Sequence, residues 1–121
     1  MPIIDAVSLI EQPEYDAVTV VLQVGNTEVL ALGERINTRW PHAYMNGYNW
    51  AALIHAYAEA QDPSLGALVQ PDPEAGSYVG VTPYSAENLE RMRDFEALIL
   101  AMLSDESALY DFIEANEIPW Q

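Results

Sequence analysis

The clearest periodic pattern along the chain is an alternation of apolar and other side chains over positions 16–24, DAVTVVLQV. Alternate positions of a strand face the same side of a sheet, and β-branched residues favour strands. We therefore predict a half-buried strand here, with one face made of Val18, Val20, Leu22 and Val24. Residues 3–10 form a second candidate strand, which would pair with the first across the turn-like Gln12-Pro13-Glu14.

The segment TEVLALGERI at positions 27–36 admits two interpretations. A tight Gly25-Asn26 turn would continue the hairpin into another strand. Alternatively, Thr27 as an N-cap with Glu28 in the first turn would begin a helix. We favour the helix.

A second helix is predicted from Asn49, its N-cap, to about residue 60, because Asp62-Pro63 then ends the pattern. Helical spacing places four apolar side chains on one face, which we expect in the core: Trp50, Leu53, Ile54 and Tyr57. His55 and Glu59 fall on the opposite side, so we expect them on an outward face.

The middle of the chain predicts a second hairpin. Leu68-Val69 and residues 78–81 are rich in β-forming residues, and the loop 71–76 between them has proline and glycine where a turn needs them. Two short strands are therefore expected on either side of this loop.

The last third of the chain predicts two helices. Ser85 would cap a helix over residues 86–103, whose apolar arc is broken only by Glu96. An unpaired buried carboxylate is costly, so Glu96 must be paired, protonated or solvated at an edge. A shorter helix begins at Ser104 or Asp105 and ends near residue 116.

These elements segregate into strand-rich and helical regions, which favours an α+β fold over a parallel βαβ arrangement. We predict a single domain over residues 1–121, in which a small antiparallel sheet of two hairpins packs against three or four helices. The pattern alone does not place the two hairpins in one sheet.

The net charge of the chain says more about its possible partners than the rest of its composition does. Nineteen acids stand against four basic residues, all arginine, which gives a formal net charge of -15. Such a field repels nucleic-acid phosphates and anionic lipid heads, so it argues against direct binding of nucleic acids or membranes and in favour of a basic protein partner. Acidity also keeps a protein in solution, and we give that plainer interpretation equal weight. No cysteine is present and no signal peptide is recognisable, which favours a cytoplasmic location.

No catalytic constellation emerges from the residue types. Gly-x-Ser-x-Gly, Walker and dinucleotide-binding glycine patterns do not occur in the sequence. His55 and Glu59 are the only helical pair of metal-ligand type, and two ligands do not close a zinc site. We predict no metal, no cofactor and no enzymatic activity. A carboxylate-dependent hydrolase stays open, because among nineteen acids some pair always lies close.

Two short motifs carry a family resemblance. The segment 46–53, NGYNWAAL, resembles a signature of the Imm51 family of immunity proteins from bacterial polymorphic toxin systems, and the segment 72–79, DPEAGSYV, resembles that family's hairpin. Asn46-Gly47 also favours a tight turn, so a structural role for this segment competes with recognition by its aromatic residues. The family motif residues are Asn46, Gly47, Tyr48, Trp50, Asp72, Glu74 and Gly76.

The resemblance implies a cytoplasmic protein that is made beside a cognate toxin, binds it and blocks it. Many such toxins are nucleases with basic, phosphate-binding clefts, which an acidic protein could cover. An acidic DNA mimic or an adaptor is the alternative. As partner-binding residues we predict acids that share solvent-facing sides of the last two helices: Glu87, Glu90, Asp94, Asp111 and Glu114.

Overall fold

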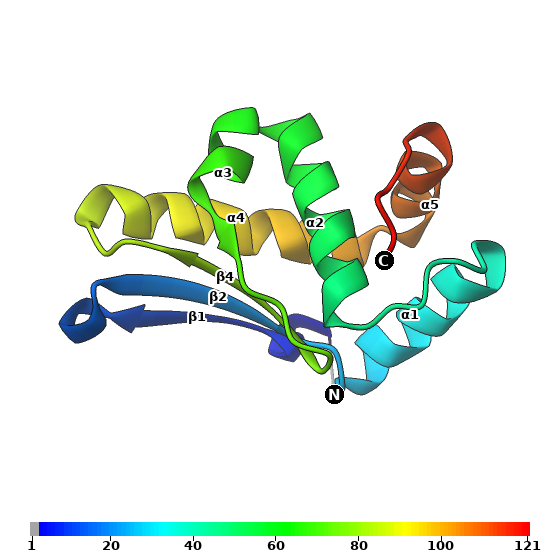
Figure 1. Cartoon of the computed structure of the whole chain (residues 1–121), viewed down its shortest axis with the longest axis horizontal. Helices are drawn as coiled ribbons and strands as arrows, with labels where there is room; N and C mark the ends of the chain where they lie inside the picture. Colours follow the sequence, from blue (N-terminus) through cyan, green and yellow to red (C-terminus); the bar gives the residue numbers. More distant parts are fainter. Residues whose placement is uncertain (1–2) are drawn as a thin grey trace.

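The computed structural model describes residues 3–121 and has a four-stranded antiparallel sheet with five α-helices among them (Figure 1). The α+β class is confirmed, with one helix more than the upper number predicted. The strands are β1 (Val7–Gln12), β2 (Ala17–Gln23), β3 (Gln70–Pro71) and β4 (Ser77–Thr82). The helices are α1 (Thr27–Arg39), α2 (Gly47–Gln61), α3 (Pro63–Leu68), α4 (Ala86–Ser104) and α5 (Glu106–Ala115), with short 3-10 turns η1 (Ile3–Ala6) and η2 (Pro13–Tyr15).

Both predicted hairpins belong to one sheet. The strand order is β1-β2-β4-β3, and every neighbouring pair is antiparallel. Val20 of β2 lies at the centre, opposite Leu9 of β1 on one side and Gly80 of β4 on the other. The β2–β4 pairing therefore joins the two hairpins, which local sequence patterns did not reveal.

The helices lie on one side of the sheet (Figure 1). Helix α4 packs across β1 and β2, while α2 packs against β4. The predicted inward side chains of β2 are buried there, as the alternation required, together with Trp50, Phe95 and Tyr78. Ser8 and Ile10 of β1 face the opposite, open side and are exposed.

Helix starts follow capping chemistry. Ser85 caps α4 by accepting a hydrogen bond from the backbone N–H of Asn88 at 3.0 Å, and Asp105 caps α5 in the same way. Residues 27–36 form part of α1, whose N-cap is Asn26. The helical interpretation of that segment is therefore confirmed, with the cap one residue earlier than predicted.

Three predicted elements need correction. Residues 3–6 form the 3-10 turn η1 instead of the start of a strand. Asn46, not Asn49, caps α2, so the helix begins at Gly47. Leu68-Val69 is not a strand, because Asp62-Pro63 ends α2 and also begins α3: Asp62 caps α3, and a proline fits the first turn of a helix. Leu68 closes α3, and the edge strand β3 follows at Gln70.

The environment predicted for His55 was wrong. Helix α2 contacts β4, α3 and α4, so more than one of its sides is covered. His55 is half-buried, with its ring against those of Tyr78 and Phe95. Glu59 is exposed and is not its partner. Glu96 is also half-exposed. Of the three arrangements considered for this carboxylate, its position agrees with solvation at the edge of the apolar arc.

Candidate functional site

The two sequence motifs meet in space at the start of α2. The backbone N–H of Gly47 donates a hydrogen bond to the carbonyl of Ala75 at 2.9 Å. A Cβ at Gly47 would lie 1.7 Å from the carbonyl oxygen of Glu74 and 2.4 Å from that of Ser77. Glycine is therefore required here because the backbone of the β3–β4 connection comes too close for any side chain.

The other motif residues divide between structural and surface positions. Asn46 accepts a hydrogen bond from the backbone N–H of Asn49 at 3.0 Å, and Trp50 is fully buried in the core. Tyr48 remains 40% exposed. Three motif residues of the second hairpin are exposed and shape the turn through their backbones: Asp72, Glu74 and Gly76.

Asn49 has a role that the sequence did not reveal. It is fully buried, and its Nδ2 donates to the carbonyl of Tyr44 at 2.7 Å. Its Oδ1 accepts a hydrogen bond from the backbone N–H of Gln121 at 2.7 Å, while Nδ2 also donates to the Gln121 carbonyl at 3.2 Å. One side chain thus joins the start of α2 to residues that precede it and to a segment 72 residues later.

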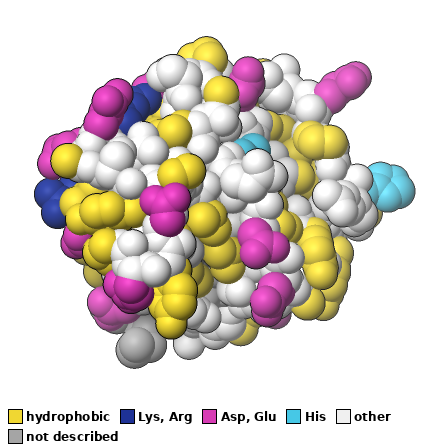
Figure 2. Space-filling view, turned by 60° about the vertical axis from the view of Figure 1, so that its left-hand side comes forward, with side chains coloured by type: hydrophobic (Ala, Val, Ile, Leu, Met, Phe, Trp, Pro, Cys, Tyr) yellow, Lys and Arg dark blue, Asp and Glu magenta, His cyan; other side chains and the backbone are white. Residues whose placement is uncertain are grey.

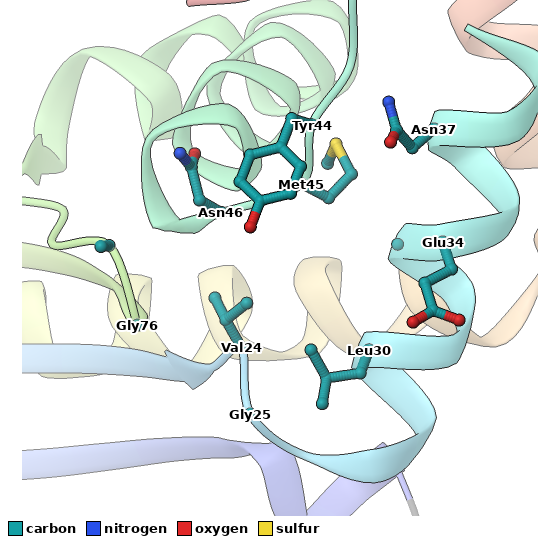
Figure 3. Close-up of a pocket in the computed structure, with 11 residues that line it drawn as sticks. Val24, Gly25, Leu30, Glu34, Asn37, Tyr44, Met45, Asn46 and Gly76 are labelled. Carbon is teal, nitrogen blue, oxygen red and sulfur yellow. The ribbon is translucent and has the colours of Figure 1, made fainter. Parts of the chain in front are cut away.

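Beside the meeting point of the two motifs lies a cleft of about 350 Å³ (Figure 3). Its walls come from the end of β2, one side of α1, the loop before α2 and the turn before β4. We call it the α1 cleft. Its lining residues are Val24, Gly25, Leu30, Gly33, Glu34, Asn37, Tyr44, Met45, Asn46, Ala75 and Gly76.

The α1 cleft combines exposed apolar groups with one carboxylate. Tyr44 is 70% exposed and Leu30 is 48% exposed, and both line the same cavity. In Figure 3 the Tyr44 ring stands over the cavity, Leu30 and Val24 lie across from it, and the Glu34 carboxylate borders one end. Large aromatic side chains at exposed positions are typical of protein-binding surfaces.

The predicted partner-binding acids do not form one surface. All five are exposed, but Glu87, Glu90 and Asp94 lie in the first half of α4, at the far end of the molecule from Asp111 and Glu114 of α5 (Figure 1). Two of the α4 acids are also offset by arginines. Arg91 pairs with Asp94 at 3.0 Å, and the Arg93 guanidinium lies 3.5 Å from the carboxylate of Glu90.

The four arginines are all engaged within the protein. Arg35 forms two hydrogen bonds with the carboxylate of Glu106, and Arg91 pairs with Asp62 at 2.8 Å as well as with Asp94. The guanidinium of Arg39 stacks over the rings of Trp40 and Tyr110. Four acids are thus paired, and fifteen of the nineteen have no arginine within ion-pair distance in the described part of the chain.

The acids on the face shown in Figure 2 do not form one block. On the face shown in Figure 2, acidic side chains are scattered, and the basic side chains lie at one edge next to acids. Hydrogen bonds from Arg91 and Ser64 lower the pKa of the Asp62 carboxyl to about 2, so the Asp62–Arg91 pair stays ionised at any physiological pH. The excess negative charge of the protein is carried by the fifteen acids that have no arginine partner among the described residues.

The other notable polar feature is the pair formed by half-buried His55 and buried Tyr78. His55 Nε2 of α2 lies 2.5 Å from the Tyr78 hydroxyl of β4. Burial lowers the pKa of His55 and raises that of Tyr78, so both are neutral near neutral pH. Neither residue lines the α1 cleft. Among residues 3–121, no three His, Cys, Asp or Glu side chains converge as they would around a metal ion.

A family model described as Immunity protein 51 matches residues 7–118. The chain belongs to the Imm51 family. The match includes both motifs and every wall of the α1 cleft, and the family name implies an immunity protein that acts against a toxin. No curated protein and no solved structure matches this Imm51 chain. None of its described helices combines the length and apolar character needed to cross a membrane.

Sequence reasoning found the motifs of this Imm51 protein but missed the cleft beside them. Leu30 and Glu34 lie one helical turn apart on α1, and Tyr44 precedes the first motif by two residues. A leucine on the polar side of an amphipathic helix was the one local signal available. Only the contact between α1 and the loop before α2 shows that these three side chains border one cavity.

Proposed function

We propose that this protein neutralises a cognate toxin in the cytoplasm of the producing cell by binding it through its acidic surface and covering a basic, phosphate-binding cleft. The observation that carries the proposal is the uncompensated charge. Because every arginine is already paired or stacked internally, fifteen carboxylates of the described residues have no arginine partner, and their charge can attract a basic protein. Membership of the Imm51 family implies that the partner is a toxin. The excess negative charge of the protein would attract a toxin with a basic surface.

The negative charge of this protein would act mainly on the rate at which it meets a basic partner. An acidic protein attracts a basic one over distances comparable with the screening length, which is about 8 Å at physiological ionic strength. Steering of this kind raises the association rate more than the final affinity. The scattered acids suit such a role, because steering depends on the summed field of the protein and needs no single cluster.

Binding is favoured over catalysis by the contents of the α1 cleft. It is lined by one carboxylate, that of Glu34, and by the hydroxyl of Tyr44, with no histidine, cysteine or serine beside them. Acyl transfer or hydrolysis needs a nucleophile with an adjacent base. The histidine predicted on an outward face, His55, is instead held against Tyr78.

The test is the salt dependence of association with the toxin encoded beside this protein. We expect the association rate to fall at least about tenfold between low and physiological ionic strength, while the dissociation rate changes little. An association rate that is independent of salt would refute the electrostatic mode. Absence of any complex with the toxin would refute the proposed function itself.

Substitutions of the predicted acids then test which part of the surface faces the bound toxin. Because the two predicted acidic sets lie at opposite ends of the molecule, they are replaced separately by lysine: Glu87, Glu90 and Asp94 in one variant, Asp111 and Glu114 in the other. The set that lies closer to the bound toxin should slow association more. Equal association rates for both variants and the native protein would show that neither set takes part.

A further inference from the structure

We propose that the α1 cleft receives an arginine side chain from the toxin, with the guanidinium between the Tyr44 ring and the Glu34 carboxylate. This inference rests on the proposed function and adds the point of contact to it. It assigns the anchoring interaction to the cleft beside the two motifs, and leaves the acids of α4 and α5 a role in steering.

The cleft is large enough to admit a long side chain. Its volume of about 350 Å³ lies at the lower end of the range of roughly 300–1,000 Å³ for small-molecule sites. Its walls are mainly apolar, with Val24 and Leu30 on one side and Met45 on the other (Figure 3). Such walls suit the methylene stem of an arginine, which packs on apolar surface while its charged end reaches a polar partner.

The side chains at the rim of the α1 cleft favour a guanidinium over other cations. Glu34 is the one ionisable acid that lines the cleft, and its carboxylate is directed along the edge of the cavity near Leu30 (Figure 3). The adjacent Arg35 cannot neutralise it, since Arg35 is bound to Glu106. A guanidinium binds a carboxylate through a planar fork and also stacks on an aromatic face, so it suits this combination better than an ammonium.

The rim is held in place before any partner binds. The carbonyl of Tyr44 accepts hydrogen bonds from Asn49 Nδ2 at 2.7 Å and from the backbone N–H of Asn46 at 2.9 Å. On the α1 side, Asn37 Nδ2 donates to the carbonyl of Pro41 at 3.2 Å. The backbone that carries the exposed Tyr44 ring is therefore fixed, which reduces the entropy lost on binding.

The chain offers matched controls for a binding experiment. Glu14 and Tyr15 lie in η2, at the opposite end of β2 from the cleft. Tyr15 is 75% exposed, close to the 70% of Tyr44. The cleft variants are Glu34→Gln and Tyr44→Ala, and the controls are E14Q and Y15A, which remove the same groups elsewhere.

The first measurement is the affinity of each variant for the purified toxin. We expect E34Q and Y44A each to weaken binding about tenfold or more, mainly through faster dissociation, and the two controls to change it less than about twofold. If the native protein binds the toxin and both cleft variants bind as tightly, the cleft proposal is overturned while the proposed function stands. If the native protein does not bind, the proposed function is refuted.

The second measurement uses a defined probe, the peptide acetyl-Gly-Arg-Gly-amide, followed by NMR shifts of the protein's backbone amides. Its control is the same peptide with citrulline, which keeps the shape of arginine and removes its charge. We expect saturable shifts at Leu30, Gly33 and Tyr44 with the arginine peptide, about tenfold weaker binding of citrulline, and loss of that difference in E34Q. Shifts spread evenly over the exposed acids, or equal binding of both peptides, would overturn the assignment.

Discussion

Replacement of Gly47 by alanine tests whether the two motifs are joined as the structure shows. Any Cβ at this position would lie 1.7 Å from the Glu74 carbonyl oxygen and 2.9 Å from its carbonyl carbon. These are backbone atoms, which cannot rotate away as a flexible side chain could. The start of α2 and the turn before β4 must therefore separate, and the hydrogen bond from Gly47 to Ala75 would be lost.

The size of the effect follows from three contributions. A lost backbone hydrogen bond costs about 1 kcal/mol. Forcing an extra carbon into a packed site costs roughly 1–3 kcal/mol. Alanine restricts the unfolded chain and so returns about 0.4–1 kcal/mol. We therefore expect Gly47→Ala to lower the free energy of unfolding by about 1–3.5 kcal/mol.

Urea unfolding followed by circular dichroism measures this difference, and Gly76→Ala in the second motif is the matched control. A Cβ at Gly76 would meet no atom within 4 Å, and its φ is not positive, so the control should not lower the free energy of unfolding and should raise it by up to about 1 kcal/mol. Gly47→Ala with the same stability as the native protein would refute the close approach of the two motifs.

Two further predictions concern the polar side chains of Asn49, which is buried, and His55, which is half-buried. Asn49→Ala removes three hydrogen bonds from a fully buried side chain and should lower the free energy of unfolding by about 2–4 kcal/mol in the same urea assay; an unchanged midpoint would contradict its anchoring role. Because burial lowers the pKa of His55 below its ordinary 6.5, the unfolded chain binds more protons, so the stability that neutral His55 contributes is present above pH 6.5 and is lost as pH falls below it. Unfolding measured from pH 7.5 down to about pH 5 should thus show native protein losing stability relative to His55→Gln, whereas exposed His42→Gln should follow the native curve. Parallel curves for native protein and H55Q would count against this reasoning.

Local patterns in the sequence determined most of the elements. The alternation over residues 16–24 predicted β2 and its buried face, because side chains two apart in a strand share a side. Ser85 predicted the start of α4, because its hydroxyl can satisfy a free N–H of the first turn. The two motifs predicted the family, which the match over residues 7–118 confirmed. Each of these inferences depends on neighbours within a few residues.

Tertiary contacts decided what local patterns left open. Asn46 and Asn49 can both cap a helix, and the approach of the β3–β4 connection to Gly47 and of residue 121 to Asn49 assigns the cap to Asn46 and an anchoring role to Asn49. His55 was misplaced because helical periodicity identifies one buried face, whereas α2 is covered on several sides. The α1 cleft could not be predicted, since its walls come from four segments between residues 24 and 76. Their proximity depends on how β2 and β4 pair, and that long-range choice is not encoded in the spacing of residues within any one segment.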